Sequence, residues 1–298
     1  MPRMAARVEE SYKQRMREIA AGYRQKYPWQ DNLGLLEGLG AKLRFVKLEG
    51  QDGAYDPEHN VVFLNPKSTP ERQRFTLAHE ISHALLLQSD DLLSDIHDSY
   101  EGEALEDAIE ILCNVGASAM LISKAMLERV TSRGLSGASV YRLMLEAEVS
   151  ASVAMVSLSE YTDQAALFAL CVRPSRERGN QKTPEDLLRG LEKPGGVEQD
   201  TRSRLEVRFA PSSRSMVYTL AHGTPIPPEH PIQKAHETGI PLEGDSYIPF
   251  RSGSKMPAWV SAYPERGRVF AVFLEQSTAP TVESPEGALE ILRAADGV

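Results

Sequence analysis

The sequence predicts an α+β protein built from two or three domains, on three observations. The chain has 298 residues, more than one domain of ordinary size usually holds. Helical patterns dominate its first half, where short strand-like segments precede a helix that carries two histidines. Strand patterns flank a charged, Gly- and Pro-rich stretch at 174–203, which we interpret as a connection inside a second α/β region.

Residues 1–27 have apolar side chains near helical spacing and predict an amphipathic helix. Two strand-like segments follow, Lys42 to Leu48 and Val61 to Leu64, with a turn-rich stretch between them. A short sheet ahead of a histidine-bearing helix can hold an extended peptide across it. We expect an edge near Val61 to Leu64 to do so by strand addition.

The next helix has clear signals at its start. Ser68 and Thr69 can cap it, and Pro70 fits the first helical turn. From Phe75 to Leu87 most residues are apolar, which predicts a largely buried helix. Polar side chains inside such a helix require partners, because unpaired buried polar groups are costly.

That helix carries the pattern His79-Glu80-x-x-His83. Positions four apart on a helix lie one above the other, so His79 and His83 present two imidazoles to one point. Two imidazoles at this spacing suit zinc. Glu80 can reach a metal-bound water without binding the metal, as a general base must. The pattern predicts metal-assisted hydrolysis of a peptide bond.

The third ligand is expected on a later helical pattern, Glu103 to Leu121. One class of these proteases carries Gly and His soon after the motif, but those positions hold Leu86 and Ser89, which excludes that class. The other class takes a Glu from a later helix. Glu110 lies on a stripe that runs into apolar positions and is the preferred ligand, with Glu106 as the alternative.

Three further polar residues are candidates for supporting roles. His97 and Tyr100 lie in the segment before this helix, and either can donate a hydrogen bond to the oxyanion of a tetrahedral intermediate. Tyr100 is our catalytic candidate of the two. Asn114 can orient a metal ligand from outside, although it also suits an ordinary helix contact.

Residues 124–162 predict helices broken at 133–137, and residues 140–155 resemble a helix-turn-helix with Ser150 as the cap of its second helix. This allows an alternative function, a DNA-binding transcription regulator with a structural metal. The second helix has no Lys or Arg before Tyr161, however, so we do not expect direct DNA binding.

In the second α/β region we expect five strands, at 166–173, 205–209, 216–220, 258–263 and 269–274. The formal net charge of −9 argues against a constitutive nucleic-acid binder. No segment reaches the ~20 apolar residues of a membrane helix. Cys113 and Cys171 are too few for a disulfide framework and predict buried free thiols and a cytoplasmic location. The oligomeric state is not predicted.

Three segments together resemble the ImmA/IrrE family of metallopeptidases, most closely its radiation-response branch. They are the run 52–60, the run 70–83 with the histidine motif, and the run 109–114 around Glu110. The segment Tyr247 to Gly253 also matches, so the resemblance extends over most of the chain.

The resemblance implies a zincin-like metallopeptidase domain at 1–122, a helix-turn-helix-like helical domain at 123–164 and a GAF-like sensor domain at 165–298. It implies that His79, His83 and Glu110 bind the metal and that Glu80 is catalytic. Zinc is the expected metal, with manganese as the alternative for this branch. The expected substrate is a helix-turn-helix transcriptional repressor of the DdrO type, whose cleavage near its C-terminus switches on DNA-damage genes.

Overall fold

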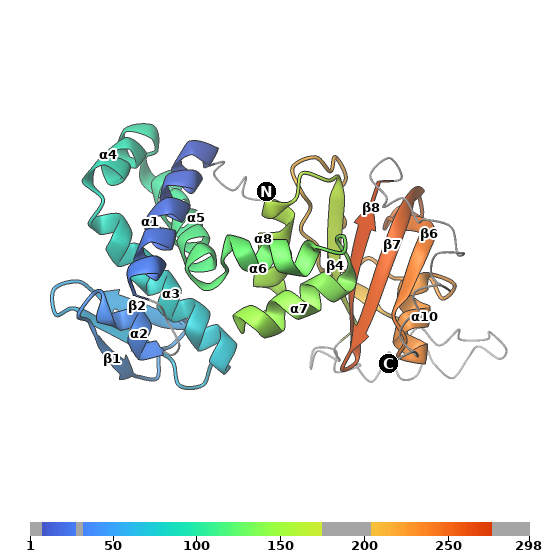
Figure 1. Ribbon diagram of the computed structural model, residues 1–298, viewed down its shortest axis with the longest axis horizontal. Helices are drawn as coiled ribbons and strands as arrows, with labels where there is room; N and C mark the ends of the chain where they lie inside the picture. The colour runs from blue at the N-terminus through green and yellow to red at the C-terminus, as the bar shows by residue number, and fades with distance from the viewer. Residues whose placement is uncertain (1–7, 28–31, 175–203, 276–298) are drawn as a thin grey trace, which may run out of the picture. The chain divides into compact units, whose positions relative to one another are not determined.

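The computed structural model describes residues 8–27, 32–174 and 204–275 (Figure 1). The chain divides into two compact units, residues 1–130 with 141–157 and residues 131–140 with 158–298. Both units combine helices with a β-sheet, so the predicted α+β class is confirmed. The connection predicted at 174–203 lies outside the described residues, except for its first residue.

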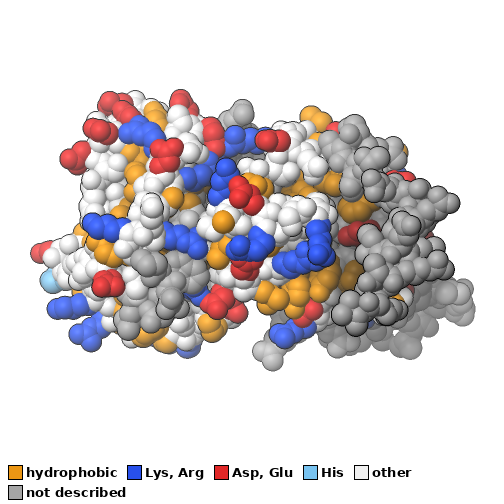
Figure 2. Space-filling model, viewed as in Figure 1, with side chains coloured by type: hydrophobic (Ala, Val, Ile, Leu, Met, Phe, Trp, Pro, Cys, Tyr) orange, Lys and Arg blue, Asp and Glu red, His pale blue; other side chains and the backbone are white. Residues whose placement is uncertain are grey.

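Among the residues that the structure describes, the first unit begins with two helices, then a small sheet, then four further helices. Its elements are α1 (Glu10–Lys26), α2 (Asn32–Glu37), β1 (Lys42–Phe45), β2 (Gly53–Asp56), β3 (Val61–Leu64), α3 (Pro70–Leu87), α4 (Asp90–Ser99), α5 (Gly102–Leu121) and α6 (Lys124–Thr131). The predicted helices α1, α3 and α5 are therefore present. Acidic side chains gather over α4, at the upper left of Figure 2.

The small sheet has the strand order β1-β3-β2. Strand β3 is parallel to β1 and antiparallel to β2, so its backbone is hydrogen-bonded on both sides. The expectation that Val61–Leu64 forms a substrate-binding edge is therefore wrong, because a central strand has no free edge to pair with a peptide. The edge strand β2 was not predicted, since the glycines at 50 and 53 favour a turn.

Helix α3 forms where its sequence signals predict. The side chain of Thr69 accepts a hydrogen bond from the Arg72 amide, and Pro70 occupies the first turn. Helix α5 packs closely against α3 and α1 at Gly116, where an added Cβ would lie 2.5 Å from Met16 Cε and 2.7 Å from Ser82 Oγ. The absence of a side chain at Gly116 therefore sets the distance between the histidine helix and α5.

Within the described residues, no single helix is long and apolar enough to cross a membrane. Helices α5 and α6 meet the criteria of length and composition only as a pair, and they are bent by 70° at the break between them. The apolar side chains of α5 are largely buried.

Helices α7 (Gly137–Ala147) and α8 (Ala151–Tyr161) each contribute to both units. They are joined by three residues, 148–150, and Ser150 caps α8 by accepting a hydrogen bond from the Val153 amide. Glu148 has a left-handed backbone with φ of 52°, a conformation that is costly for a residue with a side chain. Its carboxylate forms an ion pair with Arg74 of α3, which attaches this turn to the histidine helix.

The second unit contains an antiparallel sheet of order β5-β4-β8-β7-β6 with helix α10 packed against it. The elements are β4 (Ala166–Val172), β5 (Glu206–Phe209), α10 (Pro231–Thr238), β6 (Leu242–Pro249), β7 (Lys255–Glu265) and β8 (Arg268–Leu274). The start of α7 is tied to this sheet, since the Gly137 amide donates a hydrogen bond to Ser261 Oγ at 3.0 Å.

In the second unit one predicted strand is absent and one observed strand was not predicted. Residues 216–220 form no strand, and Val217 is 82% exposed, so its apolar character does not mark a paired strand. Strand β6 was missed because it contains Gly, Asp and Pro, which are depleted in strands. It exists because it pairs with β7 along its whole length.

Candidate metal centre

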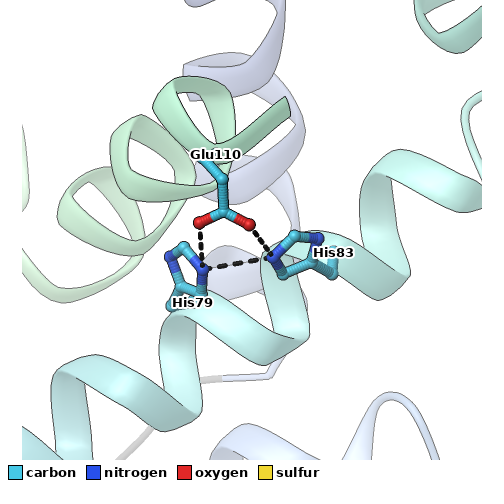
Figure 3. Close-up of side chains that lie close together, drawn as sticks. All are labelled: His79, His83 and Glu110. Atoms are coloured by element: carbon cyan, nitrogen blue, oxygen red, sulfur yellow. Dashed lines mark hydrogen bonds and ion pairs between the residues drawn. The ribbon is translucent and has the colours of Figure 1, made fainter. Parts of the chain in front are cut away.

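Three side chains from two helices meet at one point. His79 and His83 project from the same side of α3, and Glu110 reaches them from α5 (Figure 3). Glu110 Oε2 lies 3.4 Å from His79 Nε2, and Glu110 Oε1 lies 3.4 Å from His83 Nε2. The two Nε2 atoms are 3.1 Å apart. The pattern on α3 therefore acquires a third partner that is distant in sequence.

This donor set fits a zinc-like cation. The ligating atoms of His79, His83 and Glu110 all lie within 4.8 Å of one another. Ligands at about 2.0–2.1 Å from a tetrahedral zinc lie roughly 3.4 Å from each other, close to the observed separations. Two imidazoles and one carboxylate are also the donors that borderline cations prefer. With three protein donors, one position of a tetrahedral centre is left for water or substrate.

The charges of the three groups support one another. Burial lowers the pKa of His79, but the hydrogen bond and the charge of Glu110 outweigh burial and raise it overall. Hydrogen bonds from His79 and His83 hold the pKa of Glu110 well below its usual value. Glu110 is therefore ionised at neutral pH, as a metal ligand must be. Its side chain is 58% exposed, so the centre is open to a substrate.

Asn114 lies one turn after Glu110 and orients a histidine. His79 Nδ1 is 3.1 Å from Asn114 Oδ1. Because the amide oxygen only accepts, the histidine donates from Nδ1. This leaves Nε2, the nitrogen that faces Glu110, as the atom that can give up its proton and bind a metal. This is the orienting contact that the sequence suggested for Asn114, and such outer contacts fix the tautomer of ligating histidines.

Glu80 is buried next to the strand that the sequence did not reveal. Burial raises the pKa of the Glu80 carboxyl, while the charges of His79 and His83 lower it. A backbone hydrogen bond from Tyr55, in β2, also favours its ionised form. A Cβ added to Gly53 would lie 3.2 Å from Glu80 Oε1 and 2.4 Å from Thr76 Cγ2. The sequence did not identify Gly53 and Tyr55 as site residues. Both act through the position of their backbone, and no pattern of side chains along the chain marks such a role.

Tyr100 and Glu106 are placed differently from the three clustered side chains. The Tyr100 hydroxyl accepts a hydrogen bond from the Glu9 amide at 3.3 Å, and its ring packs edge-on against Tyr12 of α1. Its oxyanion role stays a prediction. Glu106 is exposed one turn before Glu110 and is not part of the His-His-Glu cluster. His97 lies near the end of α4, a helix where the sequence suggested only a connecting segment.

Both cysteines are free and buried, as predicted. Burial raises the pKa of the Cys113 and Cys171 thiols, and the charges of Glu110 and Glu80 raise that of Cys113 further. Neither thiol is therefore ionised near neutral pH, which is unlike a reactive or metal-binding cysteine.

Residues 36–159 match the Peptidase_M78 family, described as IrrE N-terminal-like domain. The radiation response metalloprotease IrrE of Deinococcus deserti is 44% identical over 278 residues, covering 92% of this chain and 93% of the relative. The protein of the same name from Deinococcus radiodurans is 46% identical over 263 residues, covering 88% of this chain and 77% of the relative.

A solved structure, a Mycobacterium tuberculosis transcriptional regulator, has a similar fold with a TM-score of 0.56. It covers 92% of this chain and 80% of its own, at 14% sequence identity, a likeness that concerns the fold alone. The matches to the two relatives extend over both units. The chain therefore belongs to the IrrE family of metalloproteases.

Proposed function

We propose that this protein is a metal-dependent endopeptidase that cleaves a helix-turn-helix transcriptional repressor of the DdrO type and thereby induces the response to radiation and DNA damage. The observation that carries the proposal is the convergence of His79, His83 and Glu110, with Glu80 beside them, in a chain from a metalloprotease family. The cytoplasm is the proposed compartment, because both thiols are free.

The proposed ligands are His79, His83 and Glu110, with zinc as the expected metal and manganese as the alternative. When bound, the metal would polarise the scissile carbonyl and lower the pKa of an attacking water toward about 7. Glu80 accepts the proton of that water and returns it to the leaving amine. Burial beside β2 keeps the Glu80 carboxylate in place, and Asn114 keeps His79 in its ligating tautomer.

The substrate strand is proposed to pair with β2. This strand is an edge of the sheet and lies against α3 at Glu80, so a peptide added to it passes the catalytic carboxylate. The proposal replaces the edge first expected at β3. The substrate backbone supplies the hydrogen bonds, and its side chains alternate between the two faces of the extended sheet.

Replacement of Glu80 by glutamine tests the catalytic assignment. Gln keeps the shape of the side chain but cannot accept the proton, so Glu80→Gln is expected to retain metal and lose cleavage by at least about 100-fold. The purified variant would be incubated with a DdrO-type repressor, with metal content measured in parallel. Glu106→Gln, an exposed residue of α5, serves as the matched control. Cleavage by Glu80→Gln at the normal rate would refute the role of Glu80.

Cleavage of the repressor is tested separately from protease chemistry. The metal-loaded protein is expected to produce one truncated repressor that lacks part of its C-terminus, as seen by mass spectrometry. Degradation into many fragments, or no cleavage while a generic peptide is cut, would contradict the proposed substrate but leave the endopeptidase assignment intact.

We also propose that residues 1–122, 123–164 and 165–298 act as peptidase, helix-turn-helix-like and GAF-like sensor parts, with the last controlling cleavage. The five-stranded antiparallel sheet with α10 supports a separate sensor part, because it has its own core. A ligand-dependent change in the cleavage rate of the full chain would support this control, and rates that never respond would count against it.

DNA reading by α8 is not part of the proposal. The side chains of α8 are mostly buried, including Ala154, Met155 and Leu158, and a recognition helix must expose the face that enters the groove. The helix also lacks Lys and Arg.

A further inference from the structure

Strand β1 forms the outer edge of the three-stranded sheet, on the side away from β2. No strand of the described ranges lies beyond it. Lys42 donates its amide to Asn60 O at 2.9 Å, and Val46 donates to Leu64 O at 3.0 Å. In a parallel ladder, alternate residues bond to the same neighbour, so the backbone groups of Leu43 and Phe45 point outward. Among the described residues these groups have no backbone partner, so the edge offers donors and acceptors to an extended chain.

The side chains along this edge combine apolar surface with positive charge. Phe45 is 54% exposed and Val46 is 43% exposed, so two neighbouring large apolar side chains are open to solvent. Lys42, Arg44 and Lys47 are exposed, and no ion pair joins any of the three to another residue that the structure describes. A hollow of about 470 Å³, lined by residues 36, 37 and 40–44, adjoins the strand.

The alternation of the strand sorts these side chains by face. Successive residues point to opposite faces, so Lys42 and Arg44 share one face, whereas Leu43 and Phe45 share the other. A strand added beside β1 would place every second side chain next to the two cations. The side chains between them would contact Leu43 and Phe45. The edge is therefore complemented by a strand with acidic side chains next to the two cations and apolar side chains next to Leu43 and Phe45.

We propose that the β1 edge is a docking site for an extended segment of a partner protein in which acidic and apolar residues alternate. The chain has a formal net charge of −9, which repels acidic partners in general. Lys42, Arg44 and Lys47 lie within six residues and are joined by no ion pair to another described residue, so they attract an acidic segment locally. The site is separate from the candidate metal centre on α3 and α5, where Glu80 lies beside the opposite edge strand, β2.

The same charges determine which partner is excluded. Lysines on an edge strand commonly prevent two identical edges from pairing, because like charges would face each other. A second copy of this chain pairing β1 with β1 would bring Lys42 and Arg44 against Lys42 and Arg44 of its partner. The edge thus rejects self-association but remains open to an acidic strand.

Hydrogen exchange on the full-length protein tests the proposal with a short, capped peptide of alternating Glu and Val. At about ten times its Kd, the peptide occupies roughly nine-tenths of the sites and slows exchange at the Leu43 and Phe45 amides about tenfold. Exchange at Lys42 and Val46, which already bond to β3, is expected to stay unchanged. Unaltered exchange at Leu43 and Phe45 under saturation, or an absence of binding, would overturn the proposal.

Two peptides and two variants separate this site from general charge attraction. A peptide with the same composition but with Glu and Val in separate blocks, and one with Lys in place of Glu, are expected to bind at least about tenfold more weakly. The double variant Lys42→Glu/Arg44→Glu should reverse the preference in favour of the Lys peptide. Lys124→Glu/Lys234→Glu makes the same change in net charge on α6 and α10, and should leave the preference unchanged. Equal effects of both double variants would refute the docking site.

Discussion

Glu110 joins two helices at a centre that would otherwise hold only two histidines. Its carboxylate lies 3.4 Å from the Nε2 atoms of both His79 and His83, and its low pKa keeps it charged. Glu106 lies one turn earlier on the same helix and is exposed. Glu110 and Glu106 therefore allow a matched comparison between an acid inside the His-His-Glu cluster and an exposed acid on the same helix.

Glu110→Ala is expected to weaken metal affinity by more than the roughly 100-fold that loss of an outer-shell contact can cost, because it removes a ligand. Glu106→Ala should bind metal normally. Metal content after dialysis against a weak chelator distinguishes the two. If Glu106→Ala loses the metal and Glu110→Ala keeps it, the third ligand is Glu106.

Asn114 is expected to affect the metal through His79 alone. Asn114→Ala removes the acceptor of the Nδ1–H group, so metal affinity should fall about 10–100-fold while the fold is retained. Asn114→Asp keeps an acceptor at the same place and should retain most of the affinity. Competition with a chromophoric chelator measures both. Equal affinities for the alanine variant and the native protein would show that Asn114 is only an ordinary helix contact.

At the scale of elements, the close approach of β2 to α3 depends on Gly53. A Cβ at this position would lie 2.4 Å from Thr76 Cγ2, closer than atoms in contact allow. The proposed catalytic carboxylate and the proposed peptide-binding edge meet here. The distance between β2 and α3 therefore determines how a peptide paired with β2 would lie relative to the Glu80 carboxylate.

Gly53→Ala is expected to destabilise the protein by about 1–3 kcal/mol and to lower kcat, because β2 must move away from α3. Metal content should be unchanged, since the ligands lie on α3 and α5. Thr76→Ser removes the nearest methyl group, so the double variant Gly53→Ala/Thr76→Ser should recover part of both losses. Thermal unfolding and peptide cleavage measure the effect. A fully active Gly53→Ala would show that the spacing is not critical.

The prediction of elements succeeded where local signals are strong. Helix α3 begins at Pro70 because Thr69 caps it, and α5 follows its apolar spacing. It failed where pairing decides the structure. Strand β2 contains a glycine that favours turns, and β6 contains Gly, Asp and Pro. Both exist because neighbouring strands satisfy their backbone hydrogen bonds, and that information lies elsewhere in the chain.

At the scale of the whole molecule, the two units hold different polar groups. The first holds the His-His-Glu cluster, whereas the second has its own apolar core and a buried histidine. His230 is fully buried at the start of α10. Its Nδ1 accepts a hydrogen bond from the Ile232 amide at 3.2 Å, and its Nε2 donates one to Tyr247 O at 2.8 Å. Burial lowers the pKa of this imidazole, which is therefore neutral in the folded state.

The second unit is expected to lose stability in mild acid. Below about pH 6.5 the unfolded chain binds a proton at His230 that the folded unit does not, so the free energy of unfolding falls as pH falls. The slope from this residue approaches about 1.4 kcal/mol per pH unit until the folded-state pKa is reached.

His230→Asn retains a capping oxygen but does not titrate. It should be less stable at neutral pH and show a smaller loss of stability between about pH 6.5 and 5. Denaturant unfolding at several pH values, followed by a probe in the second unit, checks this. Identical slopes for both proteins would contradict it.

The sequence by itself determined which donors the candidate site offers: two imidazoles and a carboxylate at helical spacing on α3, with Glu110 and Asn114 on one stripe of α5. These patterns are local, because the spacing of residues along a helix determines which side chains share a face. Only the tertiary structure decided which strand edge lies beside Glu80, because strand order depends on hydrogen bonds between distant segments. It also decided that Gly116 and Gly53 set the distances between elements, since contacts across a core depend on shape and leave no pattern along the chain.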